Sequence, residues 1–463
     1  MSEKASVIEK KILTGSMWKT MFALSWPAVI AMILYGGNSV LDAFFVGQFV
    51  GEDALSGVSL AYPLSSFTLA FGTMIGGGGA AVLSIAIGAK NKEVQTKILD
   101  HVNTYCLICG ILFTIFGLLL AEPLVYMMGA RDAVLAEGTA YFQVTLIGSV
   151  FWIYSLANNL IVRAEGSMAK AAAIMGTGLA VNAVASYVLI TVFGMGITGA
   201  AWGTNIGMLS YSLIGMWYFK SGKASFKCEV FGIGRDKQVL KDVFRLGFPS
   251  FIMAMMGFVQ SLVVFNALSI YGTSADIAYY GVVSRLVGFL MTPMMGLMRA
   301  AQPMFGMNYG AKNYLRVIEA YKVFSLTALL LCAPAWIITM ISPELLTSTM
   351  FPGEITPEMG NFMRVYMLTM PMLSYVMMGM TLFPSIDDPK PAAIIGIARQ
   401  LVFYLPVMII APMFFGVSAI YYGSFAIDAV VTVWALLMVK SKFKKLRNMA
   451  ASEVAENAEN SPI

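Results

Sequence analysis

An aspartate inside an apolar run is the residue that most clearly suggests chemistry. Asp42 lies in NSVLDAFFVGQF, residues 38–49, a stretch typical of a membrane-buried helix. An ionised carboxylate in hydrocarbon costs at least ~2.5–3.5 kcal/mol, and such residues usually face a cavity and take part in function. Asn38 precedes Asp42 by one helical turn and shares its helix face. A buried carboxylate of this kind can bind a proton, which neutralises it, or Na⁺, which takes oxygen ligands.

Polar residues of three later apolar runs lie at a similar predicted depth. A rise of ~1.5 Å per residue places Asp42 ~7 Å, Tyr141 ~9 Å, Thr204 ~10 Å and Asn182 ~13 Å below the outer surface. Ser186 lies one turn outward from Asn182 on the same face. Hydrogen bonding between helices is the alternative role for such residues. The predicted cation-coupling set is Asp42, Asn38, Tyr141, Asn182, Ser186 and Thr204.

The composition is that of a membrane protein. Of the 463 residues, 58% are hydrophobic and 12% are charged, and the mean hydropathy is +0.76. A soluble domain carries roughly 25% charged residues. We therefore expect an all-α polytopic protein of the cell (plasma or inner) membrane. The net charge of +5 follows from the loop pattern below and requires no nucleic-acid partner.

Twelve apolar runs are long enough to cross a bilayer, which takes about 20 residues. With the N-terminus in the cytoplasm, 25 of the 30 Lys and Arg residues fall in inner segments, whereas only Arg131 and Arg364 fall in outer ones. Basic residues favour the cytoplasmic side, so this asymmetry supports twelve spans with both termini in the cytoplasm. The predicted spans are residues 20–47, 55–87, 98–121, 135–162, 169–191, 197–219, 245–270, 277–309, 319–342, 360–384, 391–413 and 416–439.

The chain contains an internal repeat. SWPAVIAM at 25–32 parallels GFPSFIMA at 247–254, and GAKN at 88–91 recurs at 310–313, in both cases 222 residues later. Six spans per half is an even number, so the halves share one topology, related by an axis along the membrane normal. The predicted organisation is a cytoplasmic segment 1–19, a first lobe 20–219, a basic linker 220–244, a second lobe 245–439 and a cytoplasmic tail 440–463.

Two pseudo-symmetric six-helix lobes around a central cavity suggest a carrier that works by alternating access. Duplication also builds channels. The position 222 residues after Asp42 is Val264, so the carboxylate belongs to the first lobe only. A channel would not predict a single carboxylate in one of two duplicated lobes.

Methionine-rich stretches of spans seven and eight are candidates for a substrate cavity. The chain holds 35 Met, which are dense in FIMAMMGFVQ (251–260) and TPMMGLMRA (292–300). Flexible Met-rich surfaces suit promiscuous binding, although ordinary packing is the alternative for any one Met. The predicted cavity residues are Asp42, Tyr35, Gln260, Asn266, Met256 and Met295.

Other charged residues inside spans have two interpretations. Asp428 can pair with Arg399 or meet a cationic substrate, and pairing is favoured because an unpaired charge there is expensive. Arg285 and Arg299 can extend to the interface or pair likewise, and no role is assigned to them. The acids expected to be solvated at inner span ends are Glu165, Asp387 and Asp388.

Three further features are interpreted as structural. Cys106 and Cys109 lie on an apolar helix with no second cysteine pair, so we expect them to pack between helices. GGGG at 76–79 lacks the Lys-Ser/Thr that follows in a phosphate loop, so close helix packing or a hinge fits better. The polar C-terminal stretch ASEVAENAENSPI (451–463) is expected to be disordered.

The chain resembles the multidrug and toxic compound extrusion (MATE) family over about residues 15–440. The resemblance rests on the order of these motifs and on their recurrence in both halves. It implies a V-shaped pair of six-helix bundles that exports bulky, often cationic, amphipathic compounds against inward Na⁺ or H⁺ flow. The motifs are LDAFFVG after Pro27, PLSSFTLAFGTMIGGGGAAVLSIAIGAKN (63–91), VRAEG (162–166), GMGITGAAWGT (194–204), TPMMGLMRAAQPMFGMNYGAKN (292–313) and IARQLVFYLP (397–406).

The resemblance also implies a first-lobe cation site. In similar transporters this site uses an aspartate in span one, a tyrosine in span four, an asparagine and an aspartate one turn apart in span five, and a threonine in span six. The span-five aspartate falls on Ser186 here, and Tyr187 stands where a proline often follows. One carboxylate thus remains, which leaves the coupling ion open. The matching residues are Asp42, Tyr141, Asn182 and Thr204.

These observations lead to one hypothesis and two alternatives. We expect a monomeric secondary active exporter that exchanges small amphipathic drugs for H⁺ or Na⁺. No cofactor or resident metal is expected, apart from transient Na⁺ at Asp42, Asn182 and Thr204. One alternative is a lipid-linked or metabolite exporter, a flippase, of the same broad fold. An intramembrane enzyme is disfavoured because the only histidine, His101, lies near the inner end of span three and no H-E-x-x-H motif occurs.

Overall fold

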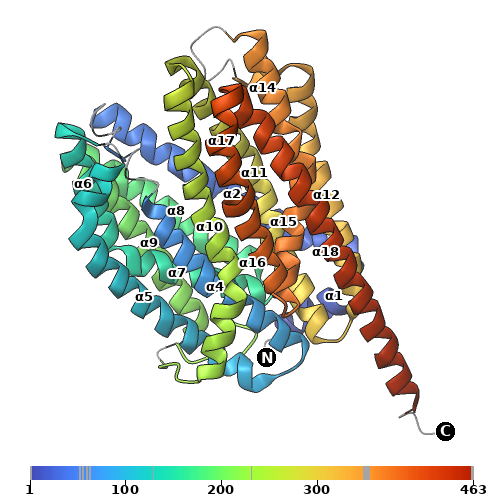
Figure 1. Ribbon diagram of the computed structural model, residues 1–463. Helices are drawn as coiled ribbons and strands as arrows, with labels where there is room; N and C mark the ends of the chain where they lie inside the picture. Colours follow the sequence, from blue (N-terminus) through green and yellow to red (C-terminus); the bar gives the residue numbers. More distant parts are fainter. Residues whose placement is uncertain are drawn as a thin grey trace.

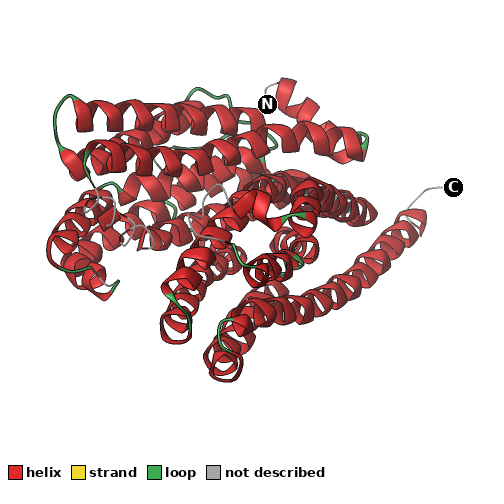
Figure 2. Cartoon of the chain, turned by 90° about the horizontal axis from the view of Figure 1, so that it is seen from above, coloured by secondary structure: helices red, strands yellow, loops and turns green. Residues whose placement is uncertain are grey.

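The computed structural model is helical along the chain (Figure 1), and no β-strand occurs among the residues it describes (Figure 2). These are residues 3–51, 54, 57, 58, 61, 64–128, 130–230, 232–347 and 355–459. The first half contains α1 (Glu3–Thr14), α2 (Met17–Phe49), α4 (Ser65–Gly88), α5 (Lys92–Met127), α6 (Asp132–Ile147), α7 (Ser149–Ala164), α8 (Met168–Thr191) and α9 (Gly196–Lys220). The second half contains α10 (Lys237–Tyr271), α11 (Ser274–Gly310), α12 (Tyr314–Ile341), α13 (Pro343–Thr347), α14 (Pro357–Met367), α15 (Thr369–Ser385), α16 (Lys390–Ile397), the π-helix η2 (Ala398–Tyr404), α17 (Leu405–Phe415) and α18 (Ser418–Glu459).

The helices account for the predicted membrane spans. Ten stretches of the described chain are long and apolar enough to cross a membrane, and the bent pair of α6 and α7 makes an eleventh. α9 has 25 residues and is also long enough, but it is less apolar because it carries polar residues such as Thr204 and Asn205. These stretches follow the order of the predicted spans. Part of predicted span 55–87 lies outside the described residues, and its helix α4 begins at Ser65. The chain is therefore a multi-pass all-α membrane protein.

Three spans are interrupted, and glycine or proline stands near each break. α6 and α7 meet at Gly148 with a bend of 54°. The second interrupted span consists of α14 and α15, and Pro371 lies in the first turn of α15. In the third, the π-helix η2 separates α16 from α17, and Pro406 lies in the first turn of α17. Proline lacks the N–H that the helical i→i−4 bond requires, so the backbone must change its pattern near it. π-Helical segments often mark functional sites.

The two halves form two bundles that pack side by side. In Figure 1 the first half runs from blue to green and the second from yellow-green to red, and both termini lie at the same end of the molecule. α4 packs against α10 and α11, and α2 packs against α11. Two termini at one end are what an even number of crossings requires.

Glycines allow the two bundles to approach each other closely at the end where the termini lie. A Cβ atom on Gly88 would lie 1.9 Å from the carbonyl oxygen of Met307, and one on Gly310 would lie 2.0 Å from that of Ile85. The two contacts are related by the repeat, because Ile85 and Met307, like Gly88 and Gly310, are 222 residues apart. The repeated GAKN motif thus begins with a glycine that lets the bundles touch through their backbones.

The core of the bundle interface is apolar, and α11 lies within it. The GGGG segment continues α4 without a break, and a Cβ on Gly78 would lie 1.9 Å from the Val243 carbonyl oxygen, as close helix packing requires.

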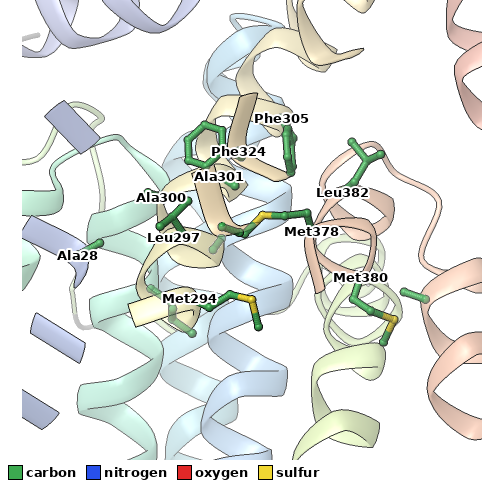
Figure 3. Packing of buried hydrophobic residues seen from close by; sticks show 14 of the residues in the cluster. Ala28, Met294, Leu297, Ala300, Ala301, Phe305, Phe324, Met378, Met380 and Leu382 are labelled. Carbon is green, nitrogen blue, oxygen red and sulfur yellow. The ribbon is translucent and has the colours of Figure 1, made fainter. Parts of the chain in front are cut away.

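Cys106 is buried and unbridged on α5, as its helix-packing interpretation predicts. Figure 3 shows the residues packed around α11, namely Ala28 of α2, Met294, Leu297, Ala300, Ala301 and Phe305 of α11, Phe324 of α12, and Met378, Met380 and Leu382 of α15.

The predicted disorder of the C-terminal tail is wrong for most of its length. α18 continues through residues 451–459 and projects beyond the bundle in Figure 1. Alanine and glutamate, which dominate this stretch, are strong helix formers, so the helix of the last span extends into it. Residues 460–463 lie outside the described part of the chain.

Candidate functional site

Asp42 lies on α2, about two turns before the helix ends at Phe49. The Nδ2 of Asn38, one turn earlier, donates a hydrogen bond of 3.3 Å to the Oδ2 of Asp42. The Oδ1 of Asp42 is buried and has no hydrogen-bond partner among the described residues. The carboxylate therefore retains one acceptor atom that a proton or a cation can occupy.

Asn182, Ser186 and Thr204 meet where α8 packs against α9. The Nδ2 of Asn182 lies 3.1 Å from the Thr204 hydroxyl and 3.5 Å from the Ser186 hydroxyl, and both of these oxygens accept from it. Glycines of α9 allow this approach, since a Cβ on Gly207 would lie 2.4 Å from the Cβ of Asn182. Asn182 is fully buried, and its Oδ1 has no partner among the described residues. The amide oxygen is thus a second acceptor that no donor satisfies.

Tyr141 is buried on α6. Asn205, which was not among the predicted residues, stabilises the bend at Gly148, where α6 meets α7. Asn205 of α9 donates from Nδ2 to the Val144 carbonyl at 2.6 Å. Its amide group fills the space next to Gly148, where a Cβ would lie 1.9 Å from the Asn205 Oδ1. Asn205 therefore stabilises the bend between α6 and α7. Its position next to Thr204 inside an apolar span was the available signal.

Five of the six predicted coupling residues, all except Tyr141, form two hydrogen-bonded groups in this structure. Asn38 and Asp42 belong to α2, and the Asn182 group belongs to α8 and α9. α2 packs directly on α8, where the rings of Phe45 and Phe49 each lie 6.0 Å from the ring of Tyr187. No hydrogen bond joins the two groups within the described chain, so their convergence on one ion stays a prediction.

The two unsatisfied oxygens define the chemistry available here. A carboxylate oxygen without a donor can accept a proton, which removes its charge. The same oxygen, together with amide and hydroxyl oxygens, is also a suitable ligand for Na⁺.

The predicted substrate-cavity residues lie on helices that meet between the bundles. Tyr35 is half-buried on α2, and Met295 is exposed on α11. Met256, Gln260 and Asn266 follow one another along α10, and Asn266 is exposed. The Oε1 of Gln260 accepts a hydrogen bond of 3.0 Å from the Nε2 of Gln400, which connects α10 to η2.

A second polar cluster lies inside the second half. The Nε of Arg399 on η2 lies 2.7 Å from the Oδ1 of Asp428 on α18, and Asp428 is buried. The Tyr404 hydroxyl lies 3.3 Å from that of Ser424 in the same region. Of the two interpretations of Asp428, the structure shows the ion pair.

One of the three acids that the sequence predicted to be solvated is instead buried. Glu165 is buried, not solvated, because the chain after α9 folds back over it. Its carboxylate accepts from the Tyr218 hydroxyl and, at 2.6 Å, from the backbone N–H of Ser225. The two other acids remain partly exposed, and each forms an ion pair, Asp387 with Arg245 and Asp388 with Lys442.

Comparisons with known proteins place the chain in a family. A family model described as MatE matches residues 27–188 and 248–410, one segment in each half. The Multidrug export protein MepA of Staphylococcus saprophyticus is 26% identical over 92% of this chain and 94% of that protein. The Multidrug export protein MepA of Staphylococcus aureus strain MRSA252 is 24% identical over 91% of this chain and 93% of that protein.

Solved structures share the fold. A crystal structure of MATE in complex with MaL6 aligns with a TM-score of 0.88 at 22% identity, covering 95% of this chain and 99% of that one. The outward-facing conformation of a multidrug resistance MATE family transporter of the MOP superfamily aligns with a TM-score of 0.85 at 22% identity, covering 95% of this chain and 98% of that one. Because the family model covers most of the length and matches once in each half, the chain belongs to the MatE family.

Proposed function

We propose that this protein is a secondary active multidrug exporter that exchanges amphipathic, often cationic, compounds for H⁺ or Na⁺ by alternating access. Membership of a transporter family and similarity to proteins named multidrug export protein support the class of cargo. One observation supports the proposal that transport is coupled to an ion. Asp42 is a carboxylate in a membrane-spanning helix, Asn38 satisfies one of its oxygens, and the other has no partner in the described chain.

The structure supports an exchange cycle that starts from the sealed inner end. The contacts at Gly88 and Gly310 close the bundles against each other where the termini lie. With the termini in the cytoplasm, this is the state that releases cargo outward and in which Asp42 accepts its cation. Pro27 and, nine residues later, the pair Gly36–Gly37 weaken α2 between Asp42 and the inner end, so neutralisation of the carboxylate can change the bend of this helix.

Cargo and ion need not share a site in this cycle. Coupling requires only that each of them favours a different conformation of the two bundles. Na⁺, where it is the coupling ion, is a transported ligand held at Asp42, Asn182 and Thr204. The proposal involves no cofactor and no chemical conversion, and a monomer is sufficient for it.

Efflux from liposomes tests the proposal. Purified protein is reconstituted, and efflux of the cation ethidium is measured under an imposed pH gradient and, separately, an imposed Na⁺ gradient. We expect one of the gradients to drive efflux and Asp42→Asn to reduce the driven rate at least about tenfold, because the variant carries no titratable carboxylate. Glu122→Gln, which removes an exposed carboxylate of α5, should behave as wild type.

Two results would contradict the proposal. Unchanged dependence on the gradient in Asp42→Asn would remove this carboxylate from the coupling mechanism. Efflux driven by neither gradient would favour the flippase of the same fold.

A further inference from the structure

Two arginines near the bundle interface, Arg163 and Arg299, have no acidic partner among the described residues. Arg163 is the next-to-last residue of α7 and is 3% exposed. Its Nε donates to the Asn159 Oδ1 at 2.7 Å, but its Nη1 is buried without a partner. Arg299 of α11 is half-buried, and no hydrogen bond or ion pair of its side chain occurs in the described chain.

The two guanidinium groups belong to one cluster. α11, which carries Arg299, packs on α2 and α7, and α7 packs on α9. The charge of Arg299 therefore acts on Arg163, on Tyr35 of α2 and on Tyr211 of α9. The Tyr211 hydroxyl is buried and has no partner among the described residues. Glu165 is the nearest acid along the chain from Arg163, and its carboxylate is already occupied by other donors. Four helices, α2, α7, α9 and α11, thus surround two positive charges.

This arrangement is incomplete as it stands. Cations at membrane depth are rare and are normally paired, and two like charges that act on each other repel. The C-terminal end of α7 offsets part of the charge of Arg163. α11 continues for eleven residues beyond Arg299 to Gly310, so Arg299 receives no such compensation. A bound anion would compensate the positive charges of both Arg163 and Arg299. The planar guanidinium group binds a carboxylate through two parallel hydrogen bonds.

The position of the cluster relative to Asp42 suggests what carries this anion. Tyr35 and Asp42 are seven residues apart, so they share one face of α2 at a spacing of about 10 Å along its axis. This face of α2 therefore carries the Asp42 carboxylate at one depth in the membrane. About 10 Å away along the helix axis, at Tyr35, the same face lies close to Arg299. A cargo molecule with a cationic group and an anionic group at opposite ends fits both.

We propose that Arg299, with Arg163 and Tyr211 behind it, binds the carboxylate of zwitterionic amphipathic cargo, an inference that rests on the proposed export function. Arg299 is the residue that contacts the cargo. Arg163 is a positioning residue, since it lies almost completely buried and acts through its charge. The site adds to the cation-coupling role of Asp42 a means of selecting among drugs by their anionic end.

A pair of dyes that differ in one group tests the proposal. Rhodamine 110 carries a free carboxylate, and rhodamine 123 is its methyl ester. Both are measured in the liposome assay, and binding to the purified protein is measured by fluorescence anisotropy. Arg299→Gln should weaken binding and transport of rhodamine 110 at least about tenfold and leave those of rhodamine 123 unchanged. Arg299→Lys should give an intermediate loss, because the charge remains without the planar geometry.

Arg285→Gln is the matched control, because Arg285 lies exposed on the same helix. It should leave both dyes unchanged. Equal loss of both dyes in Arg299→Gln would show a structural role and overturn the proposal, as would unchanged binding of rhodamine 110. Wild-type protein that exports ethidium but does not bind rhodamine 110 would also overturn it. Failure to export ethidium would instead remove the proposed function itself.

Discussion

At the scale of single residues, the ion pair of Arg399 and Asp428 shows how a charge is tolerated inside the second bundle. The side chains are 18% and 7% exposed, and the Arg399 Nε lies 2.7 Å from the Asp428 Oδ1. A buried pair of this kind roughly offsets its own desolvation cost. Removal of one partner, however, leaves an uncompensated charge in the apolar interior.

We therefore predict that Arg399→Gln and Asp428→Asn each lower the free energy of unfolding by about 3–5 kcal/mol. The double variant Arg399→Gln/Asp428→Asn should recover most of this loss. Equilibrium unfolding in detergent, followed by circular dichroism, measures all three. Additive losses in the double variant would mean that the two residues stabilise the protein independently.

At the scale of elements, Asp236 determines where α10 begins. Its carboxylate accepts from the backbone N–H of Gln238 at 3.0 Å and from that of Val239 at 3.4 Å. It also pairs with Lys97 of α5 at 3.2 Å, which attaches the linker to the first bundle. Lys97, followed by the two N–H groups, lowers the pKa of Asp236 below its ordinary value.

Two substitutions separate the cap from the ion pair. Asp236→Asn retains a good N-cap but loses the charge, whereas Asp236→Ala loses both. We predict a lower melting temperature for Asp236→Ala than for Asp236→Asn at pH 7. Because the folded-state pKa is depressed, the charge stabilises the protein fully above the unfolded pKa of ~3.9 and its effect is lost as the pH falls through the folded value. The difference between wild type and Asp236→Asn should therefore vanish in acid, and a difference that grew there would refute the assignment.

At the scale of the whole molecule, the end where the termini lie is sealed by contacts that repeat with the duplication. The Gly88–Met307 and Gly310–Ile85 contacts are the two symmetric halves of this seal. α1 lies across the same end, where the Asn308 Nδ2 donates to the Ile12 carbonyl at 3.3 Å. Opening at this end must break both glycine contacts together.

Gly88→Ala should therefore destabilise the sealed state, because the new Cβ would lie 1.9 Å from a backbone oxygen. Spin labels at Thr96 of α5 and Leu315 of α12, both exposed, report the separation of the inner ends. We expect a larger population with a long separation, together with slower export. Gly257→Ala is the control, since nothing lies within 4 Å of its Cβ position. Equal distance distributions in the two variants would argue against the seal.

The sequence by itself determined features that depend on local energetics. Apolar runs of sufficient length specify spans, since each must satisfy its backbone within the membrane. The i to i+4 spacing of Asn38 and Asp42 brought those two side chains together on one helix. The repeat, which includes GAKN, indicated two related halves, and the glycines of GGGG indicated close packing.

The tertiary structure alone decided which helices face one another. Asn182 meets Thr204, and Asn205 holds the bend at Gly148, because α8 and α9 are rotated to place these residues at their interfaces. Glu165 is buried because the linker folds back over it, which its polar surroundings in the sequence did not indicate. Helix rotation and tilt follow from packing between distant segments. No local pattern specifies them, and so the cluster of Arg163 and Arg299 was visible only in the folded molecule.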